Sequence, residues 1–206
     1  MYTLYSAGTA NGRKVPILLE ELSVAYEVRR VDLRKGEQND ATFRALNPNG
    51  KIPVLVDDQG PAGETIAVFE SGAILIYLAE KEKSDLWPAE GAERYAVLQW
   101  LMFQMGVVGP NFGQYDHFKS RAAPPGVGYA VQRFGKEVKR VYGLLDVQLG
   151  ASEFLAGAYS IADIATYPWA VRHAALGLDL GHYPAVRRWL GTMGKRPAVQ
   201  RGMKAV

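Results

Sequence analysis

The sequence predicts an α/β domain followed by an all-helical domain, and three observations support this prediction. In the first part of the chain, short apolar strand patterns alternate with helical patterns, which favours a mixed sheet with covered faces. A charged stretch at residues 80–85 interrupts this alternation, and no strand pattern appears from Glu90 onward. The predicted divisions are an α/β domain at residues 1–81, a linker at 82–90 and an all-helical domain at 91–206.

The composition is that of a globular protein without thiol chemistry of its own. The chain has 206 residues, 48% apolar and 22% charged, which is enough to bury roughly 70% of the surface of the unfolded chain. It contains no cysteine, which excludes disulfides, thiolate metal sites and a cysteine nucleophile. The net charge is only +3 and the basic residues are dispersed, so binding to nucleic acid is not expected. The first residues show no secretory signal, so the cytosol is the expected location.

The elements of the first part follow from apolar spacing. Four apolar residues recur at helical intervals, and Pro16 is acceptable if it lies in the first turn of that helix. The predicted elements are a strand at 2–5, a loop at 6–12, a helix with Val15, Leu18, Leu19 and Leu22 on one face, a strand at 26–33 and a short helix at 40–46.

Residues 47–74 are the stretch around which this domain is organised. A turn at 47–50 leads through Pro53 into a strand at 54–56, because proline fits the start of a strand better than its interior. A strand at 66–69 returns and delivers Glu70-Ser71 to the start of a helix. Serine is a good helix cap, and the free N–H groups at a helix start attract anions. The isomer of the Ile52–Pro53 bond stays open, and a cis bond would expose a backbone edge to a peptide-like ligand.

The second part reads as helices. One of its segments, Tyr95 to Tyr115, has no charged residue and is long enough to span a bilayer, but it holds several polar residues, a proline and three glycines. We therefore expect a helix buried on most faces, in a core or a subunit interface, and no membrane partner. The predicted helices are at 93–108, 129–149, 160–176 and 183–195, with a Gly- and Pro-rich loop at 120–128.

Ser160 and Asp163 have the spacing of a capping box. The serine caps a helix, and the acid three residues later returns to the serine N–H. We interpret both residues as structural, since losing such a cap costs about 0.5–2 kcal/mol.

The loop between the first strand and the first helix is the best candidate for chemistry. It follows the carboxyl end of a strand, where open α/β sheets bind ligands. Elsewhere the sequence has no phosphate loop, nucleophile elbow or zinc-binding histidine pair, and no metal site is predicted.

Two motifs carry a resemblance to a known family. NPNGKIPVL at residues 47–55 and ESGAILIYL at 70–78 resemble the glutathione-binding signature of the glutathione transferases, N-P-x-G-K-I-P-x-L followed by E-S-x-A-I-x-x-Y-L. The resemblance implies a thioredoxin-like first domain, an all-helical second domain and glutathione as co-substrate. The segment from Tyr159 to Asp163 likewise resembles the folding motif of the helical domain in this family.

The loop sequence Thr9-x-Asn11-Gly12 resembles the bacterial nu class of this family, whose members reduce disulfides with glutathione, and the likeness extends along nearly the whole chain. Some classes place a tyrosine at the sulfur, but Tyr5 lies within the predicted strand, and we interpret it as a packing residue. The resemblance implies that Thr9 and Asn11 contact the sulfur, that Arg133 reaches the ligand from the partner subunit of a homodimer, and that the tripeptide is held by Gln38, Lys51, Ile52, Pro53, Glu70 and Ser71.

The chemistry is plausible in magnitude. A free thiol has a pKa near 8.5. A hydrogen bond to the thiolate and the start of a helix could together lower this pKa by roughly one to two units, so no general base is required. Because the chain has no cysteine, a disulfide reductase of this kind must take both reducing equivalents from two glutathione molecules and accommodate glutathione disulfide as product.

We therefore expect a glutathione-dependent disulfide-bond reductase, and two alternatives stay open. The first is a transferase or organic peroxidase that uses the same thiolate on small electrophiles. The second is a regulatory module that binds glutathione without turnover.

Overall fold

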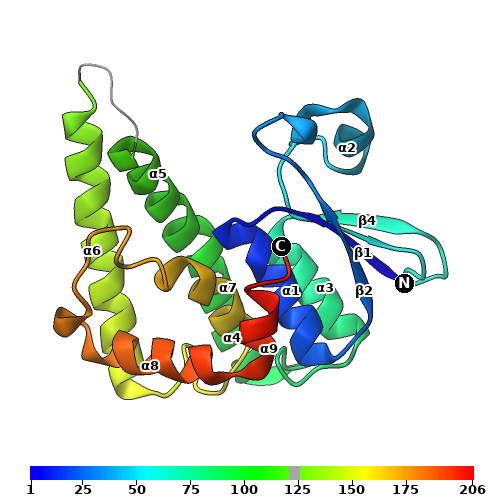
Figure 1. Ribbon diagram of the computed structural model, residues 1–206. Helices are drawn as coiled ribbons and strands as arrows, with labels where there is room; N and C mark the ends of the chain where they lie inside the picture. The colour runs from blue at the N-terminus through cyan, green and yellow to red at the C-terminus, as the bar shows by residue number, and fades with distance from the viewer. Residues whose placement is uncertain (121–125) are drawn as a thin grey trace. The chain divides into compact units, whose positions relative to one another are not determined.

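A computed structural model describes residues 1–120 and 126–206, so most of the predicted loop at 120–128 lies outside the described residues (Figure 1). The chain forms two compact units, Met1–Ala89 together with Lys195–Val206, and Glu90–Gly194. This division differs from the predicted one at the C-terminal end. The short helix α9 (Pro197–Gly202) was not predicted, and it packs against α1 (Ala10–Leu22) of the first unit.

The first unit is built on a four-stranded sheet. Its strands are β1 (Tyr2–Ser6), β2 (Tyr26–Arg30), β3 (Val54–Asp57) and β4 (Ile66–Phe69), in the order β2-β1-β3-β4. β1 and β2 are parallel, whereas β3 runs antiparallel to both β1 and β4, which confirms the predicted mixed sheet.

Strand β2 ends earlier than predicted because the chain turns after it. The N–H of Val31 still donates to the main-chain oxygen of Ser6, at 2.8 Å. The carboxylate of Asp32 then accepts the N–H groups of Arg34 and Lys35, at 2.9 and 3.3 Å, which folds these residues into a turn.

Helices cover both faces of the sheet. α1 and α3 (Ser71–Lys81) lie on one face, while the 3₁₀ turn η1 (Glu37–Asn39) and α2 (Ala41–Leu46) lie on the other (Figure 1). The core against α1 and α3 includes Leu4, Leu18 and Ile74, all with 0% exposure. Phe43 of α2 packs in a cluster of its own with Val31 and Val54.

Pro16 lies in the interior of α1 rather than in its first turn, because the helix already begins at Ala10. A proline has no N–H, so the carbonyl of Gly12, four residues earlier, loses its helical donor. The buried hydroxyl of Ser6 donates to that carbonyl instead, at 3.0 Å. The end of β1 thereby supplies the bond that Pro16 cannot make.

Ser71 is the first residue of α3 and not its cap. Glu70 occupies the cap position, with φ = 70° and ψ = 116°. The Ser71 hydroxyl instead accepts a hydrogen bond from Lys14 of α1. The predicted capping role of Ser71 was therefore wrong, although the position of the helix start was correct.

The second unit is helical, as predicted. Its core is formed by large side chains with 0% exposure, among them Phe112, Tyr142, Leu145 and Trp189. Its helices are α4 (Gly91–Phe103), the π-helical turn η2 (Gln104–Val108), α5 (Gly109–Ser120), α6 (Gly128–Ala151), α7 (Ile161–Ala170), the 3₁₀ turn η3 (Leu180–His182) and α8 (Pro184–Lys195).

The uncharged segment from Tyr95 to Tyr115 differs from the prediction in its helical winding. It is not one continuous α-helix, because η2 changes the winding between α4 and α5. Tyr95 is 67% and Met102 46% exposed within a single chain, so the subunit interface that was expected as an alternative to a core stays a prediction. Within residues 1–120 and 126–206, no helix combines the length and the apolar character needed to cross a membrane.

The capping box at the start of α7 is confirmed. One oxygen of the Asp163 carboxylate accepts the N–H of Ser160 at 3.1 Å, and the Ser160 hydroxyl accepts the N–H of Ala162 at 3.3 Å. The other carboxylate oxygen accepts the N–H of Leu155 at 3.1 Å and the indole N–H of Trp189 at 2.9 Å. This carboxylate therefore ties α7 to α8 as well as capping it.

Candidate active site

One edge of the sheet gathers the predicted site residues of the first unit. Tyr5 pairs with Val54, and Val54 pairs with Phe69. The end of β1, the start of β3 and the end of β4 therefore lie side by side. The chain leaves this edge into the starts of α1 and α3, so two helix N-termini open at the same place (Figure 1).

The loop after β1 presents Thr9 and Asn11 at the start of α1. Thr9 caps the helix, and its hydroxyl oxygen accepts the N–H of Gly12 at 3.1 Å. Gly12 is required by close approach, because a Cβ there would lie 2.0 Å from the main-chain oxygen of Ala7. Asn11, the second residue of the helix, is half-buried. A threonine hydroxyl that accepts one bond still has a proton to donate, so both predicted catalytic residues can offer a donor here.

Glu70 and Ser71 occupy the start of α3, beside the cis Ile52–Pro53 bond that precedes β3. A positive φ at a non-glycine residue such as Glu70 costs of order 1–3 kcal/mol, and such strain clusters at ligand-binding sites. The Glu70 side chain is exposed, whereas Ser71 is 3% exposed. The pair thus offers a carboxylate to solvent and a hydroxyl beside the first N–H groups of α3.

Lys14 is a residue of this edge that the sequence interpretation missed. It is 1% exposed, and its Nζ donates to the Ser71 Oγ at 3.2 Å. Burial lowers the pKa of this lysine from 10.5 to about 7, and the charge of Glu70 acts in the opposite direction. The signal was in the sequence, because Lys14 stands four residues before Leu18 and so falls on the apolar face of the helix.

The turn before β3 brings Gln38 next to Gly50. A Cβ on Gly50, whose φ is 63°, would lie 3.1 Å from the main-chain oxygen of Gln38. The Oε1 atom of Gln38 is buried and has no hydrogen-bond partner among the described residues. Asn47 holds the turn, since its side-chain nitrogen donates to the main-chain oxygen of Lys51 at 2.7 Å. Lys51 is exposed, while Ile52 packs partly against the Phe43 cluster.

Arg133 belongs to the second unit of the chain. It lies on α6 with 59% of its side chain exposed, and its Nη1 is 3.9 Å from an oxygen of Glu137, four residues later. Within one chain Arg133 thus forms an exposed i,i+4 pair of the kind that contributes only a few tenths of a kcal/mol. Its contact with a ligand of the partner subunit stays a prediction.

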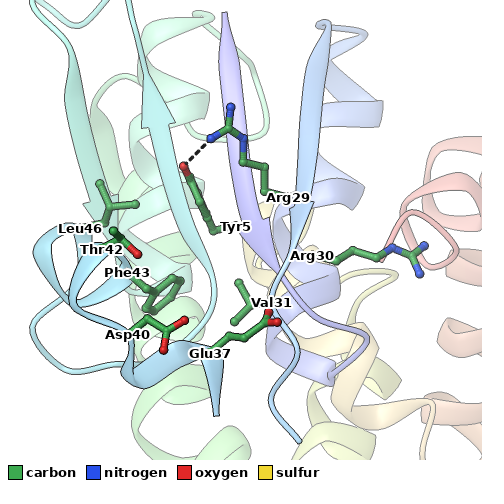
Figure 2. A pocket seen from close by; sticks show the side chains of 9 residues that line it. All are labelled: Tyr5, Arg29, Arg30, Val31, Glu37, Asp40, Thr42, Phe43 and Leu46. Atoms are coloured by element: carbon green, nitrogen blue, oxygen red, sulfur yellow. Dashed lines mark hydrogen bonds between the residues drawn. The ribbon is translucent and has the colours of Figure 1, made fainter. Parts of the chain in front are cut away.

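The Tyr5 side chain contacts residues of β2 and α2. Its hydroxyl accepts a hydrogen bond from Arg29 at 3.1 Å, and its ring meets Phe43 edge-on with a centroid distance of 6.3 Å. Tyr5 lines a cavity of about 370 Å³. Its charged lining residues are Arg29, Arg30, Glu37 and Asp40, which Figure 2 shows together with Tyr5. Among the described residues, Thr9 and Ser71 are not part of this lining. The contacts agree with a packing role for Tyr5.

Comparison with known proteins gives one consistent result. Residues 1–80 match the family model for the glutathione S-transferase N-terminal domain, and residues 130–197 match that for the C-terminal domain. The chain is 46% identical to the disulfide-bond oxidoreductase YfcG of Escherichia coli (strain K12) over 201 residues, which covers 96% of this chain and 92% of that relative.

Two solved structures have nearly the same fold as this chain. A glutathione transferase family member from Pseudomonas fluorescens pf-5, with two glutathione bound, is 42% identical with a TM-score of 0.92, over 98% of this chain and 92% of that one. A glutathione transferase from Pseudomonas putida, with one glutathione disulfide bound per subunit, is 42% identical with a TM-score of 0.91, over 98% of this chain and 90% of that one. The protein described here therefore belongs to the glutathione transferase family.

Proposed function

We propose that this protein is an enzyme that reduces disulfide bonds with glutathione. The observation that carries the proposal is the sheet edge where the start of α1, with Thr9 and Asn11, meets the start of α3, with Glu70 and Ser71, in a chain without cysteine. The name of the Escherichia coli relative and the glutathione disulfide in the Pseudomonas putida structure support the same reaction.

The reaction balances with two glutathione molecules. The thiolate of the first attacks one sulfur of the substrate disulfide, so that a mixed disulfide forms and a thiolate leaves and takes a proton from water. The thiolate of the second attacks the glutathione sulfur of the mixed disulfide, which releases the second substrate thiol and forms glutathione disulfide. The protein changes no covalent bond of its own.

The residues at the edge divide the work of binding and activation. The γ-glutamyl carboxylate of glutathione binds at the start of α3, where the Ser71 hydroxyl and free N–H groups can donate to it. Glu70 pairs with the ligand ammonium, and Gln38, Lys51, Ile52 and Pro53 hold the remainder of the tripeptide. Thr9 and Asn11 donate to the sulfur, and their bonds together with the start of α1 lower its pKa by roughly one to two units.

The working form is a cytoplasmic homodimer in which Arg133 of the partner subunit reaches the tripeptide. The exposed apolar side chains Tyr95 and Met102 on α4 support an interface, since surfaces buried between obligate subunits are apolar. Arginine suits the role because its planar group forms two hydrogen bonds with a carboxylate and stays charged when partly buried.

Steady-state kinetics tests the proposal directly. We expect turnover with glutathione and 2-hydroxyethyl disulfide, with two glutathione consumed per disulfide, to exceed turnover with 1-chloro-2,4-dinitrobenzene. Faster conjugation of the aromatic electrophile would favour a transferase. Glutathione binding by calorimetry without either activity would instead identify a regulatory module.

A further inference from the structure

Arg13 is a cation beside the loop at residues 6–12, and the reaction scheme above does not use it. It stands on α1, where its main-chain N–H donates to the main-chain oxygen of Thr9 at 3.1 Å. A helical side chain leans toward the helix N-terminus and covers the turn before its own Cα. The guanidinium accordingly lies against the loop, with its Nη2 atom 3.9 Å from the position that a Cβ on Gly8 would take.

The guanidinium of Arg13 lacks the partners that a half-buried charge normally has. Its Nε atom is buried and has no hydrogen-bond partner among the described residues. The ion pairs between described residues do not include Arg13 either. A buried polar group without a partner is costly, and in a folded protein it calls for an explanation. An anion that binds during the reaction would supply one.

The proposed reaction brings such an anion to this place. The substrate disulfide must reach the sulfur of a glutathione whose thiolate and two carboxylates outweigh its one ammonium group. A disulfide that carries carboxylates is repelled by this charge. A fixed cation beside Gly8, the residue before Thr9, offsets the repulsion, and an arginine can form two parallel hydrogen bonds with a carboxylate.

We propose that Arg13 is a specificity-determining residue that selects disulfides bearing a carboxylate, because its guanidinium binds that carboxylate while the thiolate attacks the disulfide. The inference rests on the proposed function, since it assumes that the glutathione sulfur lies at Thr9 and Asn11. The substrate class is then that of disulfides formed by acidic small thiols or by peptides with free carboxylates.

Val206 provides the other explanation for the position of Arg13. Its main-chain oxygen lies 3.4 Å from the same Cβ position on Gly8, so the C-terminal segment also reaches the loop. A purely structural Arg13 would hold this segment in place. Its removal would then lower Tm and affect all substrates alike, whereas removal of a selective arginine separates substrates by their charge.

The experiment measures kcat/KM at saturating glutathione for three disulfides of similar size. They are 3,3′-dithiodipropionate, 2-hydroxyethyl disulfide and cystamine, whose end groups are anionic, neutral and cationic. Each value is divided by the rate constant of the same disulfide with free glutathione, which removes differences between the leaving thiols. Because kcat/KM for the disulfide ends with loss of the first thiol, it does not report binding of the second glutathione.

We expect the corrected wild-type value to be about tenfold or more higher for the anionic than for the cationic disulfide. Arg13→Met should lower the anionic value about tenfold and leave the neutral value within about twofold, since one charged hydrogen-bonded contact is lost. Arg13→Lys should restore part of the loss, and Arg13→Glu should shift the preference toward cystamine.

Arg201→Met is the matched control, because it removes the same charge from a residue paired with Glu20 at the other end of α1. It should leave the preference among the three disulfides unchanged. Equal effects of Arg13→Met on all three would overturn the selective role. A wild type without preference for the anionic disulfide would overturn it without any variant and leave the proposed function intact. Turnover of none of the three by the wild type would instead overturn the proposed function and this inference together.

Discussion

The starts of α3 and α7 are both helix N-termini, and they are built in opposite ways. At α7, Ser160 and Asp163 occupy the first N–H groups with their own side chains, and both residues are buried. At α3, Glu70 has a strained backbone and an exposed side chain, while the Ser71 hydroxyl is bonded to Lys14. A helix N-terminus whose N–H groups are capped by its own side chains supports the fold. A helix N-terminus with a strained backbone and a buried lysine beside it is suited to an anionic ligand.

Removing the closed cap should have the largest effect. Asp163→Ala leaves the N–H groups of Leu155 and Ser160 and the indole of Trp189 without their acceptor. Each unsatisfied buried donor costs about 1–3 kcal/mol, so we expect the free energy of unfolding to fall by roughly 3 kcal/mol or more. Urea unfolding measures this loss. A change below about 1 kcal/mol would contradict the structural role of the cap.

The same carboxylate should make stability depend on pH. Burial raises the pKa of Asp163 from 3.8 to about 6, although its hydrogen bonds act in the other direction. As the pH rises, the Asp163 carboxyl therefore ionises at a lower pH in the unfolded state than in the folded state. The stability contributed by this group is full below about pH 3.8 and is lost by about pH 6, by up to roughly 3 kcal/mol. The free energies of unfolding of the wild type and of Asp163→Asn, measured between pH 4 and 7, isolate the effect. The stability of the wild type relative to the variant should fall as the pH rises, and a relative stability that rises with pH would contradict the prediction.

At the open edge, Asn11→Ala should affect turnover and not folding. It removes a donor to the thiolate, worth about 1.5–3 kcal/mol, so kcat/KM for disulfide reduction should fall about tenfold to a hundredfold. Tyr5→Phe is the control and should keep most of the activity. A loss under about threefold in Asn11→Ala would move the sulfur contact to Thr9 or to a main-chain N–H.

Ser71→Ala and Ser160→Ala form a direct test of the comparison. Ser71→Ala, like Glu70→Gln, should weaken glutathione binding about tenfold with little change in Tm, since each loses one bond to a charged ligand group. Ser160→Ala should lower Tm and leave Kd unchanged. Calorimetric titration gives Kd and thermal unfolding gives Tm for the three variants, which separates the two roles. A loss of stability in Ser71→Ala at unchanged Kd would mean that Ser71, like Ser160, is a structural residue.

Arg133→Ala should have the smallest effect, because this arginine is 59% exposed within one chain. We expect the KM for glutathione to rise about threefold, roughly 0.7 kcal/mol, at unchanged Tm. Isolated heterodimers of Arg133→Ala and Asn11→Ala subunits should carry one intact site, so at glutathione concentrations below KM their kcat/KM per dimer should exceed that of both parents. With subunit exchange verified by mass spectrometry, mixed dimers without recovery would place Arg133 outside the partner's site.

Most of the fold could be predicted from the spacing of apolar residues and from the residues typical of turns. The alternation of short strands and helices predicted the mixed sheet, and the Ser160–Asp163 spacing predicted a capping box that the structure contains. The predicted domain ranges could not anticipate that α9 returns to α1, because six residues near the end of a chain have no periodicity that reveals a distant partner. Helix winding is equally invisible, since the change at η2 leaves the apolar pattern unbroken.

At the site, motifs located Glu70 and Ser71 but misjudged which residue precedes the helix. A positive φ at a glutamate runs against its local preference, so it is set by the tertiary structure and not by the sequence nearby. The apolar helix face on which Lys14 lies was readable from the sequence, but Lys14 was missed because a lysine at such a position usually extends its charge to solvent, whereas this one is 1% exposed.

The bond from Ser6 to the Gly12 carbonyl has a consequence for anyone who sets out to stabilise this enzyme. Exchanging Pro16 for alanine would improve an isolated helix and return a main-chain donor to Gly12. It would also displace the Ser6 hydroxyl, which is fully buried, from its acceptor and loosen the loop that Ser6 and Gly12 hold at both ends. A substitution that stabilises the helix would then destabilise the loop. Ser6 and Pro16, ten residues apart, therefore have to be redesigned together.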